Sequence, residues 1–242
     1  MLTLGKPENI LHTHRYKIGN KELEHVFEEK DLGVYVDADL SFEEHIATKV
    51  KKANQIMGLI RRSFTYLDKE SFTKLYTALV RPHLEYAQSV WSPHLKKYQD
   101  LMEKVQMRAT KLVDHMGALD YSERLRALNL PTLAFRRYRG DMIEVFKHFH
   151  NYDRSIVSKS FQPRERSSRT HQFQLHERIP SDGIRGVHHN AFYNRTARQW
   201  NELASHVVEA TSVDMFKNRF DAANKNNTRR FDYEATTTTS DS

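Results

Sequence analysis

Residues 41–64 read SFEEHIATKVKKANQIMGLIRRSF, and apolar side chains recur in them at alternating spacings of four and three. The recurring positions are Ile46, Val50, Ala53, Met57, Ile60 and Phe64. This period places all of them on one face of an α-helix. Ser41 followed by Glu44 has the pattern of a capping box, which predicts that the helix starts there. A long amphipathic helix is therefore expected, with its charged face exposed.

The same helical period continues downstream of this segment. Helices are expected over about 68–91, 96–115, 121–128, 133–149, 190–203 and 212–222. Asp68 is the expected N-cap of the first of these. A break is expected in it near Arg81, because Pro82 lacks an N–H. Upstream, residues 16–23 have the pattern of a hairpin that turns at Gly19-Asn20, and residues 32–36 that of a strand. The predicted fold class is mainly α, with short N-terminal β-strands, a helical bundle, and a loop-rich basic C-terminal region carrying short helices.

Composition divides the chain and excludes several classes of protein. The boundaries expected are 1–40, 41–150, a basic extended connector over 151–189, short helices over 190–223, and a disordered tail over 224–242. The 242 residues include no Cys, which excludes disulfides and thiolate zinc sites and fits a reducing compartment. Neither a membrane-spanning apolar run nor a secretory signal is recognisable, so an intracellular protein without a membrane partner is expected.

Charge and carboxylates each leave two readings open. The net charge is +7, and the excess of basic over acidic residues falls in residues 41–200. This distribution fits a polyanion partner and a solvated helical surface about equally well. Asp37-Ala38-Asp39 follows the predicted strand, and paired carboxylates at a strand end can hold divalent metals. The alternative is local, because a turn and a helix start also use acidic side chains. The fourteen His show no familiar metal spacing.

Four blocks of sequence resemble one family in the right order. They are LYTALVRPHLEYAQSVWSP (75–93), EKVQMRATKLV (103–113), YSERLRALNLPTLAFRRYRGDMIEVFK (121–147) and FYNRTARQWNELASHVVEATSVDMFKNRFD (192–221). The chain resembles the C-terminal part of reverse transcriptases of non-LTR retrotransposons, in the jockey and chicken-repeat-1 group. Ala204 stands where that family usually has Pro.

The resemblance implies a primer grip, a thumb-like helical bundle and a C-terminal region. Leu32-Gly33 resembles the Leu-Gly of the primer grip, which holds the 3′ end of the growing strand. The family's catalytic aromatic-Ala-Asp-Asp box and its fingers would lie upstream of residue 1. The resemblance thus implies that this portion of an RNA-directed DNA polymerase has no catalytic residue, metal site or cofactor of its own, although the whole enzyme uses Mg. It also favours the structural reading of Asp37 and Asp39.

The implied partners are RNA, DNA or an RNA–DNA hybrid, in the nucleus or cytoplasm. A palm and fingers supplied in trans are a further candidate partner. The expected phosphate contacts are Lys49, Lys51, Lys52, Arg61 and Arg62 on the first helix, the cluster Arg136, Arg137 and Arg139, and the connector residues Arg164, Arg166 and Arg169. Tyr86, Trp91 and Trp200 could stack on bases, although core packing is favoured. Arg81-Pro82-His83 has no assigned chemistry. The alternatives are a non-enzymatic protein-interaction module and a non-functional remnant of an element.

Overall fold

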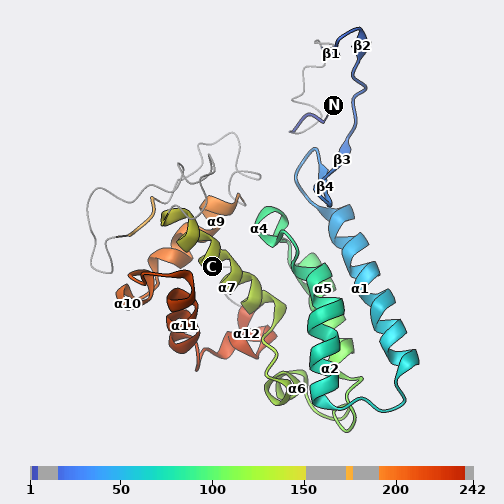
Figure 1. Ribbon diagram of the computed structural model, residues 1–242, viewed down its shortest axis with the longest axis vertical. Helices are drawn as coiled ribbons and strands as arrows, with labels where there is room; N and C mark the ends of the chain where they lie inside the picture. The colour runs from blue at the N-terminus through green and yellow to red at the C-terminus, as the bar shows by residue number, and fades with distance from the viewer. Residues whose placement is uncertain (1, 5–15, 151–172, 177–190, 238–242) are drawn as a thin grey trace.

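The computed structural model describes residues 2–4, 16–150, 173–176 and 191–237, and the described chain is mainly helical (Figure 1). Two short antiparallel hairpins precede the helices. The predicted fold class is therefore confirmed. Arg164, Arg166 and Arg169, with the rest of the predicted connector apart from 173–176, lie outside the described residues.

The first hairpin forms as the sequence predicts. Strand β1 (Lys17–Ile18) pairs with β2 (Lys21–Glu22) across Gly19-Asn20, and Gly19 has a φ of 59°. A positive φ is what a two-residue hairpin turn requires, and glycine adopts it without steric cost.

The second hairpin corrects the predicted strand over 32–36. Strand β3 (Glu28–Asp31) pairs with β4 (Val34–Asp37), and Leu32 and Gly33 form the turn, with φ values of 43° and 84°. Strand β3 was missed because EEKD is charged and wholly exposed, so it has none of the apolar alternation that marks a half-buried strand.

Helix α1 (Glu43–Ser63) buries the predicted apolar face, but it begins differently from the prediction. Phe42 is the N-cap residue with a φ of 57°, and no side chain caps the helix, so the expected Ser41/Glu44 capping box is wrong. The Asp37 carboxylate instead accepts hydrogen bonds of 2.6 Å from the backbone N–H groups of Ser41 and Phe42. Asp37 thus fixes the chain path from β4 into α1, the structural role that the sequence favoured.

The helix around Pro82 does not break there; a π-helix, which is wider than an α-helix, precedes the proline. Helix α2 (Lys69–Leu75), capped by Asp68 as predicted, runs into a π-helix (Tyr76–Val80) and then α3 (Arg81–Glu85). A π turn tolerates a missing N–H because it already interrupts the α-helical hydrogen-bond ladder. The break falls later, at Ala87 with a φ of 54°, before α4 (Gln88–Trp91). The expected continuous helix from residue 84 to 91 is therefore wrong.

The following helices keep the predicted order. Helix α5 (Lys96–Thr110) ends earlier than expected, whereas α6 (Tyr121–Leu128) and α7 (Leu133–Phe149) have the predicted bounds. Then come α9 (Phe192–Asn201), the unpredicted α10 (Ser205–Val208) and α11 (Val213–Ala223).

Residues 224–237 do not form the expected disordered tail. They form a 3-10 turn (Thr228–Arg230) and helix α12 (Tyr233–Thr237). The Thr132 N–H donates to the carbonyl of Arg230 at 2.9 Å, and the Tyr233 hydroxyl donates to Asp100 at 2.6 Å. Polar composition misled the prediction, because backbone hydrogen bonds and one buried ring hold this segment in place.

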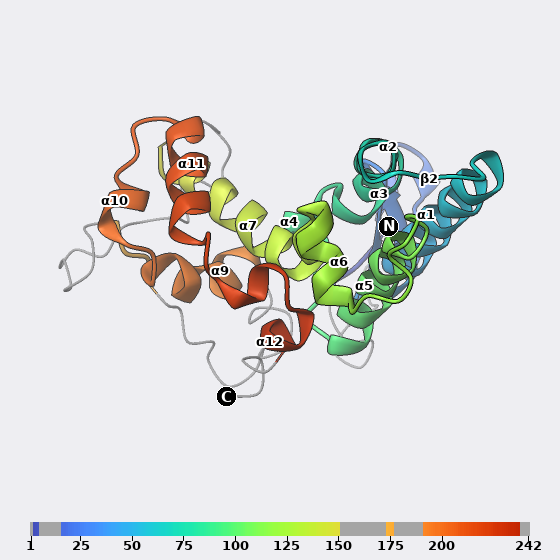
Figure 2. The same ribbon diagram turned by 90° about the horizontal axis from the view of Figure 1, so that it is seen from below.

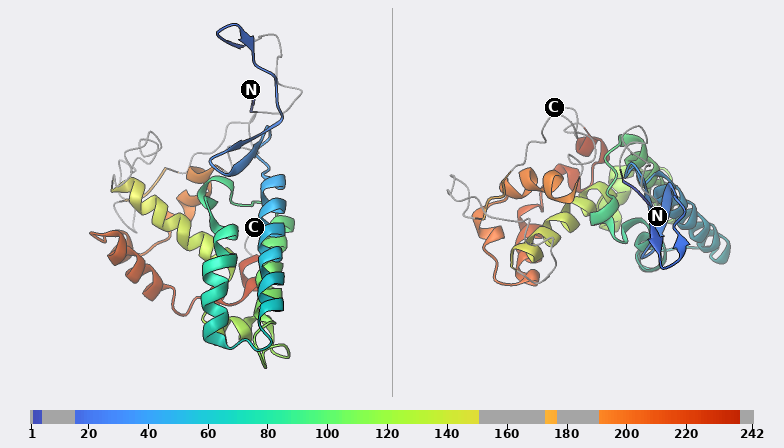
Figure 3. Two further views of the ribbon diagram at one scale, coloured as in Figure 1. Left: turned by 45° about the vertical axis from the view of Figure 1, so that its right-hand side comes forward. Right: turned by 90° about the horizontal axis from the view of Figure 1, so that it is seen from above.

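Helix α7 lies between the helices that precede it and those that follow it (Figures 2 and 3). It contributes side chains to two hydrophobic cores. The first core contains β4, α1 to α6 and Leu133, at the start of α7. The second contains the rest of the buried face of α7, Leu175, and α9 to α11. The sequence analysis assigned α7 to the helical domain of residues 41–150, whereas most of the buried face of α7 packs against residues 192–220. No helix within the described parts of the chain is long and apolar enough to cross a bilayer.

Candidate nucleic-acid interface

The basic residues of α1 lie on two different flanks of the helix. Lys49 and Lys52, three residues apart, share the flank that faces α3. Lys51 and Arg62 are exposed on another flank. At about 100° per residue, Lys51 lies about 160° around the helix from Lys49 and Arg62 lies about 140° from it. Arg61 is also exposed. The five predicted contacts therefore do not form one surface.

Tyr86 connects the predicted primer-grip turn to α1. Its hydroxyl donates a 2.9 Å hydrogen bond to the carbonyl oxygen of Leu32. A Cβ built on Gly33 would lie 3.7 Å from the Tyr86 ring, and the Lys49 ammonium lies 5.8 Å from the ring centroid. The tertiary structure thus brings Leu32, Gly33 and Lys49 to one place. Both Leu32 and Tyr86 remain open to solvent, with exposed fractions of 84% and 53%.

This place is electrostatically positive. Burial lowers the pKa of the His83 imidazole, and the charges of Lys49 and Lys52 lower it further. Burial and the charge of Lys49 likewise lower the pKa of His45 to about 4. We define the exposed surface of Leu32, Gly33, Lys49, Lys52, His83 and Tyr86 as the turn–helix surface.

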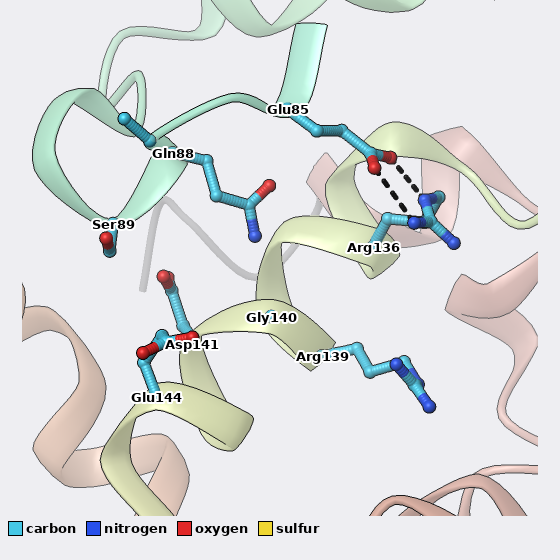
Figure 4. Close-up of a pocket in the computed structure, with 9 residues that line it drawn as sticks. Glu85, Gln88, Ser89, Arg136, Arg139, Gly140, Asp141 and Glu144 are labelled. Atoms are coloured by element: carbon cyan, nitrogen blue, oxygen red, sulfur yellow. Dashed lines mark hydrogen bonds and ion pairs between the residues drawn. The ribbon is translucent and has the colours of Figure 1, made fainter. Parts of the chain in front are cut away.

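The three arginines of the second predicted cluster have partners or burial within the protein. Arg136 forms a bidentate ion pair with Glu85, which links α7 to α3 (Figure 4). Arg139 forms another with Asp221 of α11, with distances of 2.6 and 2.7 Å. Arg137 is buried, and burial lowers its pKa. The three arginines point to different neighbours because nearby helix positions lie on different faces, so they do not form one exposed cluster.

A cavity of about 270 Å³ lies between α4 and α7, beside the Glu85–Arg136 pair (Figure 4). Gly140 allows this close approach, because a Cβ there would lie 2.0 Å from the Gln88 amide nitrogen. The Asp141 carboxylate in the wall is paired with Arg195 of α9 at 3.0 Å. The cavity is polar, and its charged side chains are already paired: most join two helices, whereas Glu144 pairs with Lys147 of the same helix.

A buried polar network accounts for two of the four sequence blocks. The Glu103 carboxylate accepts hydrogen bonds from the Tyr121 hydroxyl at 2.5 Å and from the Leu133 N–H at 3.0 Å. Gln106 donates to the Tyr121 oxygen and to the Pro131 carbonyl, both at 3.0 Å. Burial raises the pKa of Glu103 to about 7, although the hydrogen bonds from Tyr121 and Leu133 act to lower it. The network fixes α5 against α6 and the first turn of α7.

The closing block has a similar structural explanation. Asn201 uses both ends of its amide on the backbone of Leu175, accepting from its N–H at 2.8 Å and donating to its carbonyl at 3.0 Å. The Trp200 indole donates to the Phe173 carbonyl at 2.7 Å. Residues 173–175 are thereby held along α9. Trp200 and Trp91 are fully buried, so core packing is confirmed for both, and Tyr86 is the exposed ring of the three candidates.

The structure assigns no metal site to the Asp37/Asp39 pair. Among the described residues there is no group of three or more His, Asp or Glu side chains able to hold a metal ion. The hydrogen bond with Asp37 raises the pKa of Asp39, and burial adds to this. Asp37 is itself directed at the backbone before α1, so the pair is part of a turn.

Sequence reasoning missed the joining role of Tyr86 and the position of His83. Tyr86 was noted as a possible stacking residue, and His83 as part of a motif without assigned chemistry. Their partners lie 54 residues away for Tyr86 and on α1 for His83. No local spacing could have paired them.

Comparison with known proteins leaves the family open. No protein-family model matches the chain, and no solved structure matches it. An uncharacterized protein of Caenorhabditis elegans is 26% identical over 124 residues, which cover 50% of this chain and 61% of that protein. The match therefore spans less than two thirds of the relative's length.

Proposed function

We propose that this chain is the primer-grip, thumb and C-terminal part of a non-LTR retrotransposon reverse transcriptase, and that it binds template–primer nucleic acid without regard to sequence. The four sequence blocks in order support the family. One observation carries the binding role: the Leu32–Gly33 turn and the Lys49 side chain meet at Tyr86. A primer grip and a thumb helix would have to face the same duplex, and these two elements are joined here.

The chemistry of the turn–helix surface suits a nucleic-acid backbone. Lys49 and Lys52 offer point charges to phosphates, which bind by releasing counterions. Tyr86 presents a ring, and Leu32 an apolar side chain, beside those charges, as a sugar or base edge would require. The other predicted contacts contribute less, because Arg136, Arg137 and Arg139 are engaged inside the protein.

The proposal gives this portion no polymerising activity, because two-metal phosphoryl transfer needs carboxylates that the family carries in its palm. Templated synthesis by the purified chain with Mg²⁺ would contradict that part. A role as a helical interaction module is the alternative, and it predicts that nucleic acid binds weakly at every salt concentration.

The test is the affinity for a labelled RNA–DNA hybrid across a salt titration. The Lys49→Glu/Lys52→Glu variant should weaken binding and flatten the dependence of log K on log salt by about two phosphate contacts. Lys104→Glu/Lys111→Glu is the matched control, because it makes the same charge change at exposed positions on and just after α5. Equal losses of affinity in both variants would mean that only the net charge of the protein matters, and they would contradict the proposed interface.

A further inference from the structure

The Arg81-Pro82-His83 motif is the part of the sequence that the proposed function leaves unexplained. The structure divides it between two sides of α3. Arg81 faces Glu85 at 3.6 Å, beside the Arg136 pair toward α7. His83 lies partly buried on the side that faces α1, where Lys49 and Lys52 act on it. His83 is therefore the third basic group of the turn–helix surface.

The charge of this cluster is not neutralised from within the described chain. Neither Lys49 nor Lys52 forms an ion pair with any residue that the structure describes, although Lys49 lies over the Tyr86 ring. Glu85, the acidic residue on the same helix as His83, is held by Arg81 and Arg136. The π-helix before α3 contributes only Tyr76, whose hydroxyl donates to Gln106 in the core. Among the described residues, the charges that act on His83 are those of Lys49 and Lys52, and both are positive.

We propose that Lys49, Lys52 and His83 form one phosphate-binding site, and that a backbone phosphate seated there holds a proton on the His83 imidazole. The inference rests on the proposed function for the source of the phosphate. The lysines supply point charges from consecutive turns of α1, and the protonated imidazole supplies N–H donors from α3. Tyr86 and the Leu32–Gly33 turn form the neighbouring wall of the site.

The site makes binding depend on pH in a defined direction. Without a ligand, burial and the two lysines keep the pKa of His83 below its ordinary value, so its imidazole is mostly neutral at pH 7. A bound phosphate is an opposite charge, which raises that pKa again. Binding therefore takes up a proton, and lower pH favours it, while nucleic-acid phosphates stay ionised throughout.

The test measures hybrid affinity between about pH 5.5 and 8.5 at constant salt, the range in which imidazole titrates. We expect affinity to rise as pH falls, by up to about tenfold per pH unit for one linked proton. His83→Gln should remove this rise. His94→Gln is the matched control, because His94 lies outside the turn–helix surface, between α4 and α5, and it should keep the rise. Tight binding that is independent of pH would overturn this inference and leave the proposed function standing.

A second measurement uses the unaltered protein and separates the two proposals. The His83 imidazole is titrated by NMR in chloride and in inorganic phosphate at equal ionic strength. Phosphate should raise its pKa, and Lys49→Gln/Lys52→Gln should abolish the difference. The same titration in both salts would overturn the site. A phosphate-dependent shift in a protein that binds no hybrid would keep the anion site and overturn its nucleic-acid role together with the proposed function.

Discussion

The Tyr86 hydroxyl donates a 2.9 Å hydrogen bond to the carbonyl oxygen of Leu32, 54 residues earlier in the chain. This bond joins the turn of the second hairpin to the junction between α3 and α4. It is the contact that converts a predicted primer-grip turn and a predicted basic helix into one surface.

Removing that bond should loosen the hairpin locally more than it destabilises the whole protein. Tyr86→Phe keeps the ring and deletes the donor, and one exposed neutral hydrogen bond contributes about 0.5–1 kcal/mol. We expect faster amide exchange at β3 and β4 and weaker hybrid binding, with a small change in global stability. Hydrogen exchange measures this, and Tyr66→Phe, at another exposed position, is the control. Unchanged exchange at the hairpin would show that the bond does not hold it.

The two flanks of α1 should differ in their effect on binding. Lys49→Glu/Lys52→Glu alters the flank facing His83, and Lys51→Glu/Arg62→Glu makes the same charge change on another flank. We expect the first variant to lose more affinity and more salt dependence, because only its residues adjoin the Leu32–Gly33 turn. Hybrid binding across a salt series measures both. A larger loss in the second variant would place the duplex on the flank of Lys51 and Arg62.

Arg136 should matter for stability and not for binding. Arg136→Gln leaves the partly buried Glu85 carboxylate with Arg81 alone, and such a loss costs about 1–3 kcal/mol. Urea unfolding should report that decrease in the free energy of unfolding, while the salt slope of hybrid binding stays unchanged. A slope that falls by about one phosphate contact would instead return Arg136 to the interface.

His45 should make the protein sensitive to acid. Its imidazole is buried beside Trp91, its Nδ1 accepts a hydrogen bond from the Tyr35 N–H, and burial is the main cause that lowers its pKa to about 4. The unfolded chain binds the proton near pH 6.5, so the stabilisation is complete above that pH and is lost as pH falls toward 4. Urea midpoints measured over this window should decline.

His45→Gln should flatten that decline, because its amide does not titrate. His206→Gln, at an exposed position, is the control and should retain the slope. An equal slope in the His45 variant would assign the acid sensitivity to other groups.

The C-terminal segment should contribute measurably to stability. Tyr233 is buried with an exposed fraction of 6%, and its hydroxyl donates to Asp100 at 2.6 Å. Tyr233→Ala should lower the free energy of unfolding by about 3–5 kcal/mol, as buried aromatic truncations do. The denaturant midpoint measures this, with Tyr66→Ala as the exposed control. No difference between the two variants would support the disordered tail that composition predicts.

The sequence by itself determined the helical class and most of the helix bounds. Periodic apolar positions and caps act within a few residues of one another, so α6, α7 and the buried face of α1 follow from local pattern. The hairpin at Gly19-Asn20 follows for the same reason. The charged strand β3 does not, because it is wholly exposed and lacks apolar alternation. The ordered segment 224–237 does not either, because its composition is polar and hydrogen bonds to residues distant in the sequence hold it.

Only the tertiary structure decided which basic residues share a surface. Arg136, Arg137 and Arg139 look like one cluster in sequence, yet they meet Glu85, the protein interior and Asp221. Lys49 and His83 belong to separate motifs, yet they lie together because α1 packs on α3. The spacing of charged residues along the sequence does not show which residue each of them contacts in the folded protein. The direction of each side chain is set by the helix face that is buried and by the neighbour against which that face packs.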